Sequence, residues 1–316
     1  MPENNWQYGV FTEATATQIE SLIAESSGAV AGGGTNFWIR PQSAVRTTGA
    51  SGTFADPFPS FTIARQAGAL STGAVVNLEG VVREQYTTPL GVNNVTVNGA
   101  QVLPRQATSG GVPNGGGATW LVPSSGVSAS SALIRVQGQG WTLNGIYFNS
   151  TSITSNGCIE PHTVGDPPAE ADGAHLTINN CILTGAKYGI YCPTGTNFVR
   201  LYNSELFGFG DSGDVAIQAT GGIGTLLDWR MVGNKFYGNA NHIIAALNKG
   251  TIKWNDFDAA TAGINLTNGT APNRVTWNTF DVAAADFDPA GGITGVTGDV
   301  WSNTLKDAIE TGLPAN

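Results

Sequence analysis

Residues 251–257 read TIKWNDF and residues 274–280 read RVTWNTF, so one pattern recurs after 23 residues. In both copies an Asn follows a Trp, and a Phe stands two residues after the Asn. Five further segments between residues 141 and 305 place an Asn shortly before an apolar residue, and successive copies are 21 to 36 residues apart. Such self-similarity is typical of a solenoid. The seven Asn of the pattern are Asn144, Asn180, Asn203, Asn234, Asn255, Asn278 and Asn303.

A second short apolar run alternates with the first. Examples are ALIRV at residues 132–136, GIYCP at 189–193 and GINL at 263–266. Runs of this length that are rich in Ile, Val and Leu and bounded by Gly and Asn are typical of strands. Frequent Gly and Asn would break the paired helices of a helical solenoid. We therefore expect an all-β fold, a parallel β-helix of about seven two-strand coils.

The recurring Asn has a structural explanation. Asn tolerates the left-handed conformation that a tight coil corner demands, and stacked Asn side chains hydrogen-bond to one another along a solenoid. We expect one structural column of Asn. The apolar residues that follow most of these Asn by two positions are expected to form an inward stack, made of Ile146, Ile182, Phe236, Phe257, Phe280 and Leu305.

Trp254 and Trp277 occupy the same place in consecutive copies of the pattern. Because Ile252 and Val275 lie two residues earlier on the same strand face, we interpret the two Trp as a core stack. The alternative is that both rings point outward, where they would form a platform for sugars.

Composition excludes several classes of protein. The chain is 41% hydrophobic and only 12% charged, which indicates a folded core. Its formal charge of −9 argues against nucleic acid as a partner, because phosphate binding needs a basic face. No apolar run approaches the roughly 18 residues of a membrane-spanning helix, so we expect no membrane insertion. Cys158, Cys181 and Cys192 are interpreted as buried thiols, and no secretory signal is visible at the N-terminus.

The sequence predicts two regions in the chain. Residues 1–35 are expected to form a short amphipathic helix and a Gly-rich linker for attachment or oligomerisation, since so short a helix must pack on a partner. Residues 36–316 are expected to form the β-helix. Its parts are the first coils and cap at 36–100, a Gly/Ser-rich insertion at 104–131, regular coils at 132–305 and a C-terminal cap at 306–316.

Residues 52–86 read GTFADPFPSFTIARQAGALSTGAVVNLEGVVREQY, with Asp56, Pro57 and Phe58 ahead of a segment with helical spacing. This stretch resembles the opening of pectin-lyase-like proteins, which begin with a Gly-rich turn, a capping helix after D-P-F, and a strand. The resemblance implies a right-handed parallel β-helix over about residues 45–305. It leaves function open, because this fold carries lyases, hydrolases, adhesins and bacteriophage spikes.

The catalytic motifs of the polysaccharide enzymes with this fold are absent. The strings N-T-D, G-H-G and R-I-K of proteins similar to polygalacturonases do not occur in the sequence. Arg200, Arg230 and Arg274 have no accompanying Asp cluster of the kind that calcium-dependent pectate lyases use. No catalytic residue is carried over from the family, and we expect no metal or cofactor.

Two polar loops remain as candidate sites. Residues 161–175 bring His and carboxylate together for ligand binding or acid–base chemistry, or form a solvated loop. Residues 205–214 place carboxylates on a coil corner as weak catalytic candidates, or form an ordinary turn. The ligand-binding candidates are His162, Asp166, Glu170, Asp172 and His175, and the catalytic candidates are Glu205, Asp211 and Asp214.

We therefore expect a bacteriophage virion surface protein, such as a spike, a fibre or a capsid-decorating protein. Such a protein is expected to be a homotrimer, to join other virion proteins through residues 1–35 and to contact a host-surface glycan. Two alternatives stay open. One is a glycan depolymerase, either hydrolase or lyase, that uses carboxylates on the flank of the β-helix. The other is a purely structural decoration protein.

Overall fold

The structure is a computed structural model. The predicted helix and most of the linker at residues 1–34, residues 104–117 of the predicted Gly/Ser-rich insertion, and the predicted C-terminal cap at 306–316 lie outside the residues that it describes. Those residues are 35–41, 50–99, 118–162, 175–193, 196–220, 226–258, 262–266, 272–280, 293–294, 298–301 and 304–305.

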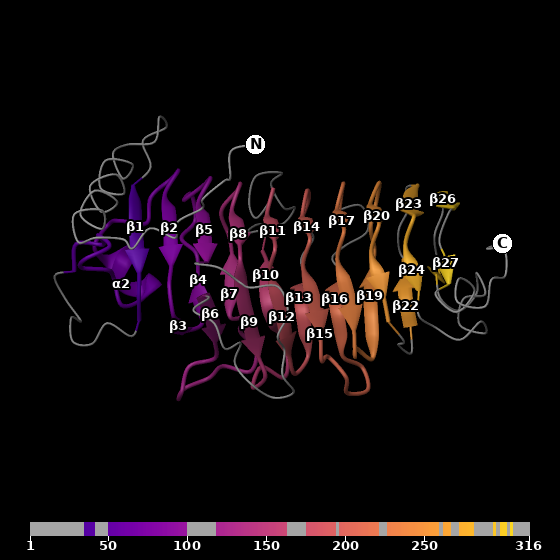
Figure 1. The fold of residues 1–316 in the computed structure, drawn as a ribbon, viewed down its shortest axis with the longest axis horizontal. Coiled ribbons are helices and arrows are strands. Elements are labelled where there is room, and N and C mark those ends of the chain that lie inside the picture. The colour runs from indigo at the N-terminus through magenta and orange to yellow at the C-terminus, as the bar shows by residue number, and fades with distance from the viewer. Residues whose placement is uncertain are drawn as a thin grey trace, which may run out of the picture.

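Three sheets run along the length of a solenoid, and every strand pair within them is parallel (Figure 1). Sheet A has ten strands: β1 (Asn36–Ile39), β2 (Val75–Leu78), β5 (Thr96–Gly99), β8 (Thr142–Asn144), β11 (Thr177–Asn179), β14 (Arg200–Tyr202), β17 (Arg230–Val232), β20 (Thr251–Lys253), β23 (Asn273–Thr276) and β26 (Gly298–Trp301). Sheet B has nine strands: β3 (Val81–Arg83), β6 (Ala118–Leu121), β9 (Ile146–Ser150), β12 (Ile182–Gly185), β15 (Glu205–Phe207), β18 (Lys235–Tyr237), β21 (Asp256–Phe257), β24 (Thr279–Phe280) and β27 (Thr304–Leu305). Sheet C has eight strands: β4 (Tyr86–Thr87), β7 (Ile134–Val136), β10 (Gly157–Pro161), β13 (Tyr188–Cys192), β16 (Val215–Ala219), β19 (Asn241–Ala245), β22 (Ala262–Asn265) and β25 (Ile293–Thr294).

The predicted parallel β-helix is confirmed, with one correction to its coils. Each regular coil contains three strands and not two. The segment around each recurring Asn is a pair of strands, such as β8 and β9, with a sharp corner between them at Gly145. The corner residue takes a left-handed φ of 68°, which Gly adopts without strain.

The core consists of apolar columns that are continuous from coil to coil. On sheet C, parallel register stacks six fully buried Ile side chains. On sheet B, Phe236, Phe257 and Phe280 stack with ring centroids 4.8 and 4.9 Å apart. Each such aromatic pair contributes about 0.5–1.5 kcal/mol beyond its burial. The Ile column is Ile134, Ile159, Ile190, Ile217, Ile243 and Ile264.

The predicted inward stack is confirmed for the three Phe and wrong at two positions, where Phe148 and Leu183 take the places expected of Ile146 and Ile182. Leu183, and not Ile182, lies in register with Phe148 and Leu206 and is buried. Ile182 pairs with Tyr147 and is only half-buried. The coil begins one residue earlier here, because Asn179 and not Asn180 pairs with Asn144.

The predicted single Asn column is two ladders. In the half-buried ladder at the end of sheet A, Asn144 donates to Asn98, Asn179 donates to Asn144, and Asn203 donates to Asn179, at 3.0–3.3 Å. The second ladder is buried and contains Asn234, Asn255 and Asn278 at the start of the sheet B strands. Asn180 is part of neither ladder and takes a left-handed φ at a corner, and Asn303 lies outside the described residues.

The buried ladder satisfies polar groups that water cannot reach. The backbone N–H and the side-chain amide of Asn234 both donate to Asn255 Oδ1 at 2.9 Å. Asn255 repeats both bonds to Asn278 Oδ1 at 3.0 Å, and its amide also donates to the Met231 carbonyl. Each Asn therefore joins three coils, and an apolar residue in its place would leave buried groups unpaired.

The interpretation of Trp254 and Trp277 as a core stack is wrong. Their exposed fractions are 59% and 47%, and both residues lie at coil corners with left-handed φ values of 56° and 60°. Ile252 and Val275 do point into the core. The left-handed conformation at the corner ends the strand, so inward and outward side chains no longer alternate there. Each Trp therefore points outward, although it stands two residues after an inward residue.

A short helix, α2 (Phe61–Gln66), covers the N-terminal end of the solenoid (Figure 1). Ser60 is its N-cap, and its hydroxyl accepts a hydrogen bond from the Ile63 N–H at 3.1 Å. Phe61 is buried and stacks on Trp120 with ring centroids 4.7 Å apart. No helix within the described ranges is long and apolar enough to cross a membrane.

Asn255→Ala tests the buried ladder. The change leaves the buried Asn234 N–H without a partner and removes a hydrogen bond from the Met231 carbonyl, so we expect a loss of about 1–3 kcal/mol in the free energy of unfolding. Urea unfolding measures it. Asn179→Ala in the half-buried ladder is the matched control, and its loss should be clearly smaller. Equal losses for the two variants would contradict the special role of burial.

Candidate functional site

A row of mostly polar side chains follows the Ile column on the outer face of sheet C. Thr87 stands one residue after Tyr86, which pairs with Ile134, and each other member stands one residue after a stacked Ile, so parallel register places the row on neighbouring strands. We call it the sheet C row. Its members are Thr87, Arg135, Glu160, Tyr191, Gln218, Ile244 and Asn265.

Glu160 is the most buried charged residue of this row, with an exposed fraction of 1%. Its Oε2 accepts from Arg135 Nη2 at 2.9 Å and from Asn156 Nδ2 at 2.8 Å, and its Oε1 lies 3.0 Å from His162 Nδ1. Burial opposes ionisation, but the hydrogen bonds from His162, Arg135 and Asn156 and the charge of Arg135 outweigh it. They hold the pKa of Glu160 below its usual 4.5, so the carboxylate is charged at neutral pH.

His162 follows β10 and is held by this carboxylate. The hydrogen bond to Glu160 assigns the proton to Nδ1, which leaves Nε2 as an acceptor. A carboxylate behind an imidazole fixes its tautomer and orientation, as in many acid–base sites. About one fifth (22%) of the His162 side chain is exposed. The arrangement can therefore accept a proton from a group in solution and return it.

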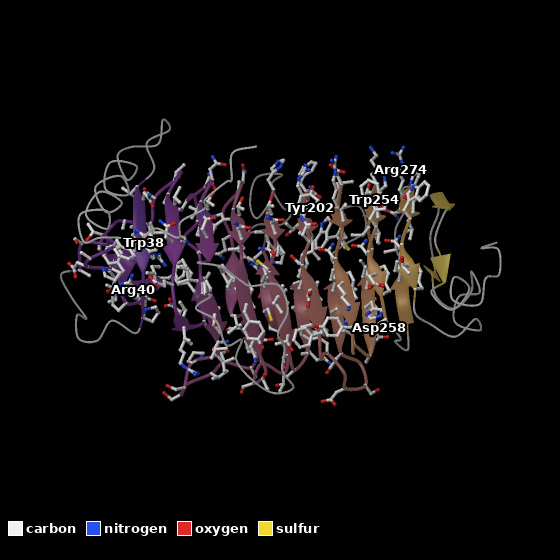
Figure 2. All side chains as sticks on the ribbon, viewed as in Figure 1. Trp38, Arg40, Tyr202, Trp254, Asp258 and Arg274 are labelled. Carbon is white, nitrogen blue, oxygen red and sulfur yellow. The ribbon has the colours of Figure 1, made fainter. Side chains whose placement is uncertain are left out.

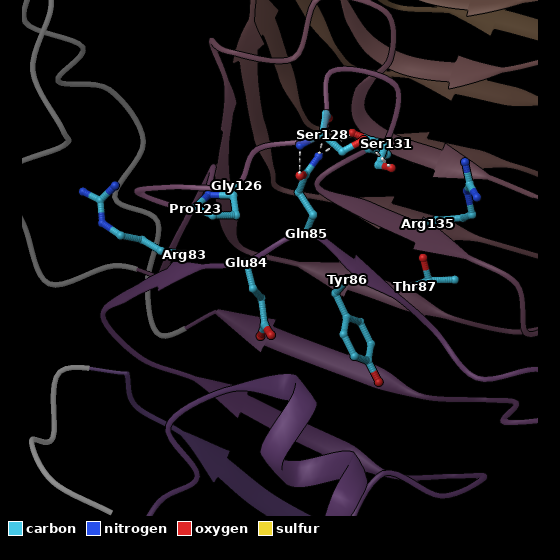
Figure 3. A pocket seen from close by; sticks show the side chains of 11 residues that line it. Arg83, Glu84, Gln85, Tyr86, Thr87, Pro123, Gly126, Ser128, Ser131 and Arg135 are labelled. Carbon is cyan, nitrogen blue, oxygen red and sulfur yellow. Dashed lines mark hydrogen bonds between the residues drawn. The ribbon is translucent and has the colours of Figure 1, made fainter. Parts of the chain in front are cut away.

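Arg135 connects this cluster with a surface pocket of about 400 Å³ (Figure 3). Thr87 lies beside Arg135 at one side of the pocket, and Gln85 crosses it to bond Ser128. The Nε of Arg135 is buried without a hydrogen-bond partner in the described part of the chain. A buried donor of this kind is a group that an ordered water or a ligand oxygen would satisfy.

Glu84 also lines the pocket, but it has a structural task. Its carboxylate accepts from the Phe61 N–H at 2.7 Å and from the Thr62 hydroxyl at 3.0 Å, so it caps the start of α2. Burial raises its pKa, although these hydrogen bonds oppose the change. Figure 3 shows Glu84 and Tyr86 directed toward the helix and away from Arg135. We therefore assign Glu84 to the cap.

The structure separates the ligand-binding candidates of residues 161–175. His162 belongs to the cluster with Glu160, and Asp166, Glu170 and Asp172 lie outside the described residues. His175 stands before a strand of sheet A, exposed, with its ring stacked on Phe198 at 4.6 Å. Where the chain is described, nothing joins His175 to His162.

The three catalytic candidates also occupy different places. Glu205 begins β15 on sheet B and accepts from the Tyr237 hydroxyl at 3.2 Å. Asp214 is buried and forms a salt bridge with Lys187 at 3.1 Å. Its carboxylate also accepts from the Asp211 N–H, so Asp211 and Asp214 belong to one turn. This geometry gives Asp214 a structural partner. A catalytic role for Glu205, Asp211 or Asp214 stays a prediction.

Sequence reasoning missed Arg135 and Glu160, although a signal was present. Aligned on the stacked Ile, the strand copies read Ile-Arg-Val at residues 134–136, Ile-Glu-Pro at 159–161 and Ile-Tyr-Cys at 190–192. The middle residues of these triplets form the sheet C row. Alignment on the preceding Gly hid this register, because the Gly of the third copy stands one residue closer to its Ile.

His242 is a structural residue. It is buried in the core, where its Nε2–H donates to the Asp258 carbonyl at 2.6 Å and its Nδ1 accepts from the Asn239 amide at 3.2 Å. Burial lowers its pKa to about 4, so the ring is neutral at physiological pH.

The three Cys are buried free thiols, as expected, and burial raises the pKa of Cys158 and of Cys181 to about 12.

Comparison with known proteins bears on the fold alone. No family model matches the chain, and no curated protein does. A crystal structure of pectate lyase Pel9A is similar, with 14% sequence identity, a TM-score of 0.49, and coverage of 89% of this chain and 79% of the other. The assignment of a parallel β-helix rests on the three continuous parallel sheets.

Glu160→Gln tests the charge cluster. The change leaves Arg135 without its buried counter-charge, and we expect a loss of about 1–3 kcal/mol in the free energy of unfolding at pH 7. A carboxylate whose pKa is lowered by folding stabilises the protein above pH 4.5, and that contribution disappears as the pH falls through the lower folded value. The difference between wild type and variant should therefore shrink below pH 4.5.

Urea unfolding between pH 7 and pH 3 measures this difference. Glu205→Gln is the control, because that carboxylate is half-buried on sheet B. A Glu160→Gln protein as stable as wild type at pH 7 would show that the ionised cluster contributes nothing to the fold.

Proposed function

We propose that this protein binds a glycan along the sheet C row. The observation that carries the proposal is the alignment of Arg135, Tyr191 and Gln218 on neighbouring coils of sheet C, with the buried Glu160 holding Arg135 in place. Neighbouring parallel strands lie about 4.8 Å apart, which is comparable with the length of one sugar unit. These partly exposed side chains can therefore meet successive sugars along the row. Guanidinium, phenol and amide groups together donate to and accept from hydroxyl groups.

Two Tyr supply the apolar contact that sugars need. Tyr188 and Tyr191 stack with ring centroids 4.6 Å apart on the outer face of β13, and both are half-buried. The Lys187 ammonium lies 5.6 Å from the Tyr188 ring centroid and is itself held by Asp214. Rings fixed in this way lose little entropy when a sugar packs its C–H face on them. Burial, Tyr188 and Glu160 raise the pKa of Tyr191, so its hydroxyl remains a donor at neutral pH.

The setting that we propose is the surface of a bacteriophage particle, where the chain would be a homotrimer attached through residues 1–35. The support comes from sequence: an expected N-terminal helix too short to be stable alone, and a β-helix without the motifs of pectin enzymes. A stiff solenoid also suits the display of a binding face at a distance from its attachment point.

Cleavage of the bound glycan is a second candidate function, favoured by the hydrogen bond between Glu160 and His162. His162 Nε2 can act as a general base because the carboxylate holds the proton on Nδ1. In hydrolysis it would take a proton from the attacking water as the glycosidic C–O bond breaks. The leaving oxygen would take its proton from the solvent. His162 stands at one end of the proposed glycan path, beside Arg135 and Glu160.

Tyr191→Ala tests glycan binding on a glycan array, followed by titration of the glycan that wild type binds. Loss of a central aromatic contact should weaken the affinity by about tenfold or more. Tyr237→Ala is the matched control, because Tyr237 also belongs to a stacked pair, with Phe207 on sheet B. Absence of binding by wild type, or equal weakening by both variants, would refute the proposal.

The same incubations, analysed for new reducing ends, decide between binding and cleavage. Cleavage by wild type that is lost in His162→Gln would establish the second function. Intact glycan after incubation with wild type would exclude it while leaving the binding proposal in place.

Light scattering tests the oligomer. We expect a mass of three times 32.7 kDa for the full chain and a monomer mass after removal of residues 1–35. The chain without those residues retains every described strand and should keep its circular dichroism spectrum. A full chain that is monomeric at all concentrations would contradict the trimer.

A further inference from the structure

One corner between sheets A and B takes the left-handed conformation in six consecutive coils. Parallel register aligns six residues at this corner, with φ between 48° and 70°. The first four are Gly or Asn, the residues that tolerate such a φ. The next two are Trp. In chain order the six are Gly145, Asn180, Asn203, Gly233, Trp254 and Trp277.

The two Trp are unfavourable for the fold in two respects. A left-handed conformation is strained for a bulky residue, whereas Asn at the same corner bears it easily. Roughly half of each ring system is also exposed to water, at 59% for Trp254 and 47% for Trp277. These are two of only four large apolar side chains that are exposed in the described part of the chain. Adjacent exposed Trp at strained positions point to a binding role.

Cations lie on the strands next to this pair. Lys253 Nζ lies 3.7 Å from the Trp254 ring centroid. Arg230 on β17 and Arg274 on β23 stand in register with Thr251 on either side of β20, and both side chains are exposed. Figure 2 shows Trp254 and Arg274 near one edge of the solenoid, toward its C-terminal end. Lys249 is exposed at the turn before β20. These four cations belong to a chain whose formal charge is −9.

Three carboxylates accompany them. Asp228 forms a salt bridge with Arg230 at 3.1 Å, Asp256 begins the strand of sheet B that follows Trp254, and Asp299 stands in register with Arg274 on β26. Four cations against three carboxylates leave this part of the surface with an excess of one positive charge. An anionic ligand would therefore be attracted to it in an otherwise acidic protein.

We infer that Trp254 and Trp277, with Lys253, Arg230 and Arg274, form a binding surface for an acidic glycan. Trp rings pack against the C–H faces of sugars, and ammonium and guanidinium groups pair with carboxylate or sulfate groups on the same sugars. The surface lies on the edge between sheets A and B, so it is separate from the sheet C row. It extends the proposed function by a second site and a class of ligand, and it does not depend on the first site.

The double variant Trp254→Asn/Trp277→Asn tests this inference. The probes are dextran and carboxymethyl-dextran, which share a backbone and differ in charge. We expect wild type to bind carboxymethyl-dextran at least about tenfold more tightly than dextran, and the double variant to lose about tenfold or more of that affinity. Because Asn180 and Asn203 already occupy this corner in other coils, the variant should unfold at the same temperature as wild type or at a higher one.

Two further variants make the result specific. Lys253→Gln should weaken binding of carboxymethyl-dextran and leave any binding of dextran unchanged. Tyr237→Ala, on the outer face of sheet B, should bind carboxymethyl-dextran as wild type does. If the Asn variant binds normally while Tyr191→Ala fails to bind its glycan, the inference fails and the function proposed for the sheet C row stands.

Three results would overturn the inference. One is that wild type binds carboxymethyl-dextran no better than dextran. Another is a clearly lower unfolding temperature for the Asn variant, which would show that the Trp residues support the fold. The third is concentration-dependent association of wild type, seen by light scattering, that the Asn variant abolishes. That outcome would identify a second copy of the chain as the occupant.

Discussion

Parallel register between coils is the constraint on which the whole structure depends. A single inward position on each sheet must be filled by a residue that packs on its equivalent above and below, as the buried Ile column of sheet C does. A slip of one residue would send that column into water and the sheet C row into the core. The buried Asn ladder fixes the same register, because Asn234 and Asn255 each bond to the equivalent Asn in the next coil.

Much of the architecture could be predicted from the sequence, because it repeats. The spacing of Asn and Phe around residues 234–280 indicated the coils, the strands and the inward aromatic stack. What failed was geometry inside a coil. Alternation of inward and outward residues suggested that Trp254 shared the face of Ile252, but a left-handed corner lies between Lys253 and Asn255 and resets that alternation. A pattern of residue types does not reveal where such a corner falls.

The candidate site was harder to predict for a related reason. His162 was found because it lies in a polar loop, yet its partner Glu160 belongs to a strand that appeared apolar. Arg135 is 25 residues away from Glu160 and meets it only through register. Catalytic strings from known families did not help, since none is present. Contacts between coils depend on which residues of successive repeats stand in register. They can be predicted only when the repeats are aligned at the correct residue.

The buried Asn ladder also has a consequence for how such a chain changes in evolution. The backbone N–H of Ser204 donates to Asn234 Oδ1, and the backbone N–H of Asn234 donates to Asn255 Oδ1. The same bond thus links successive coils, and one coil can take the place of its neighbour. Deletion or duplication of a whole coil would therefore rejoin matching rungs and matching core columns, whereas loss of a few residues within a strand would not. The natural unit of gain and loss is the coil, and the length of the solenoid can vary in such steps without exposing its interior.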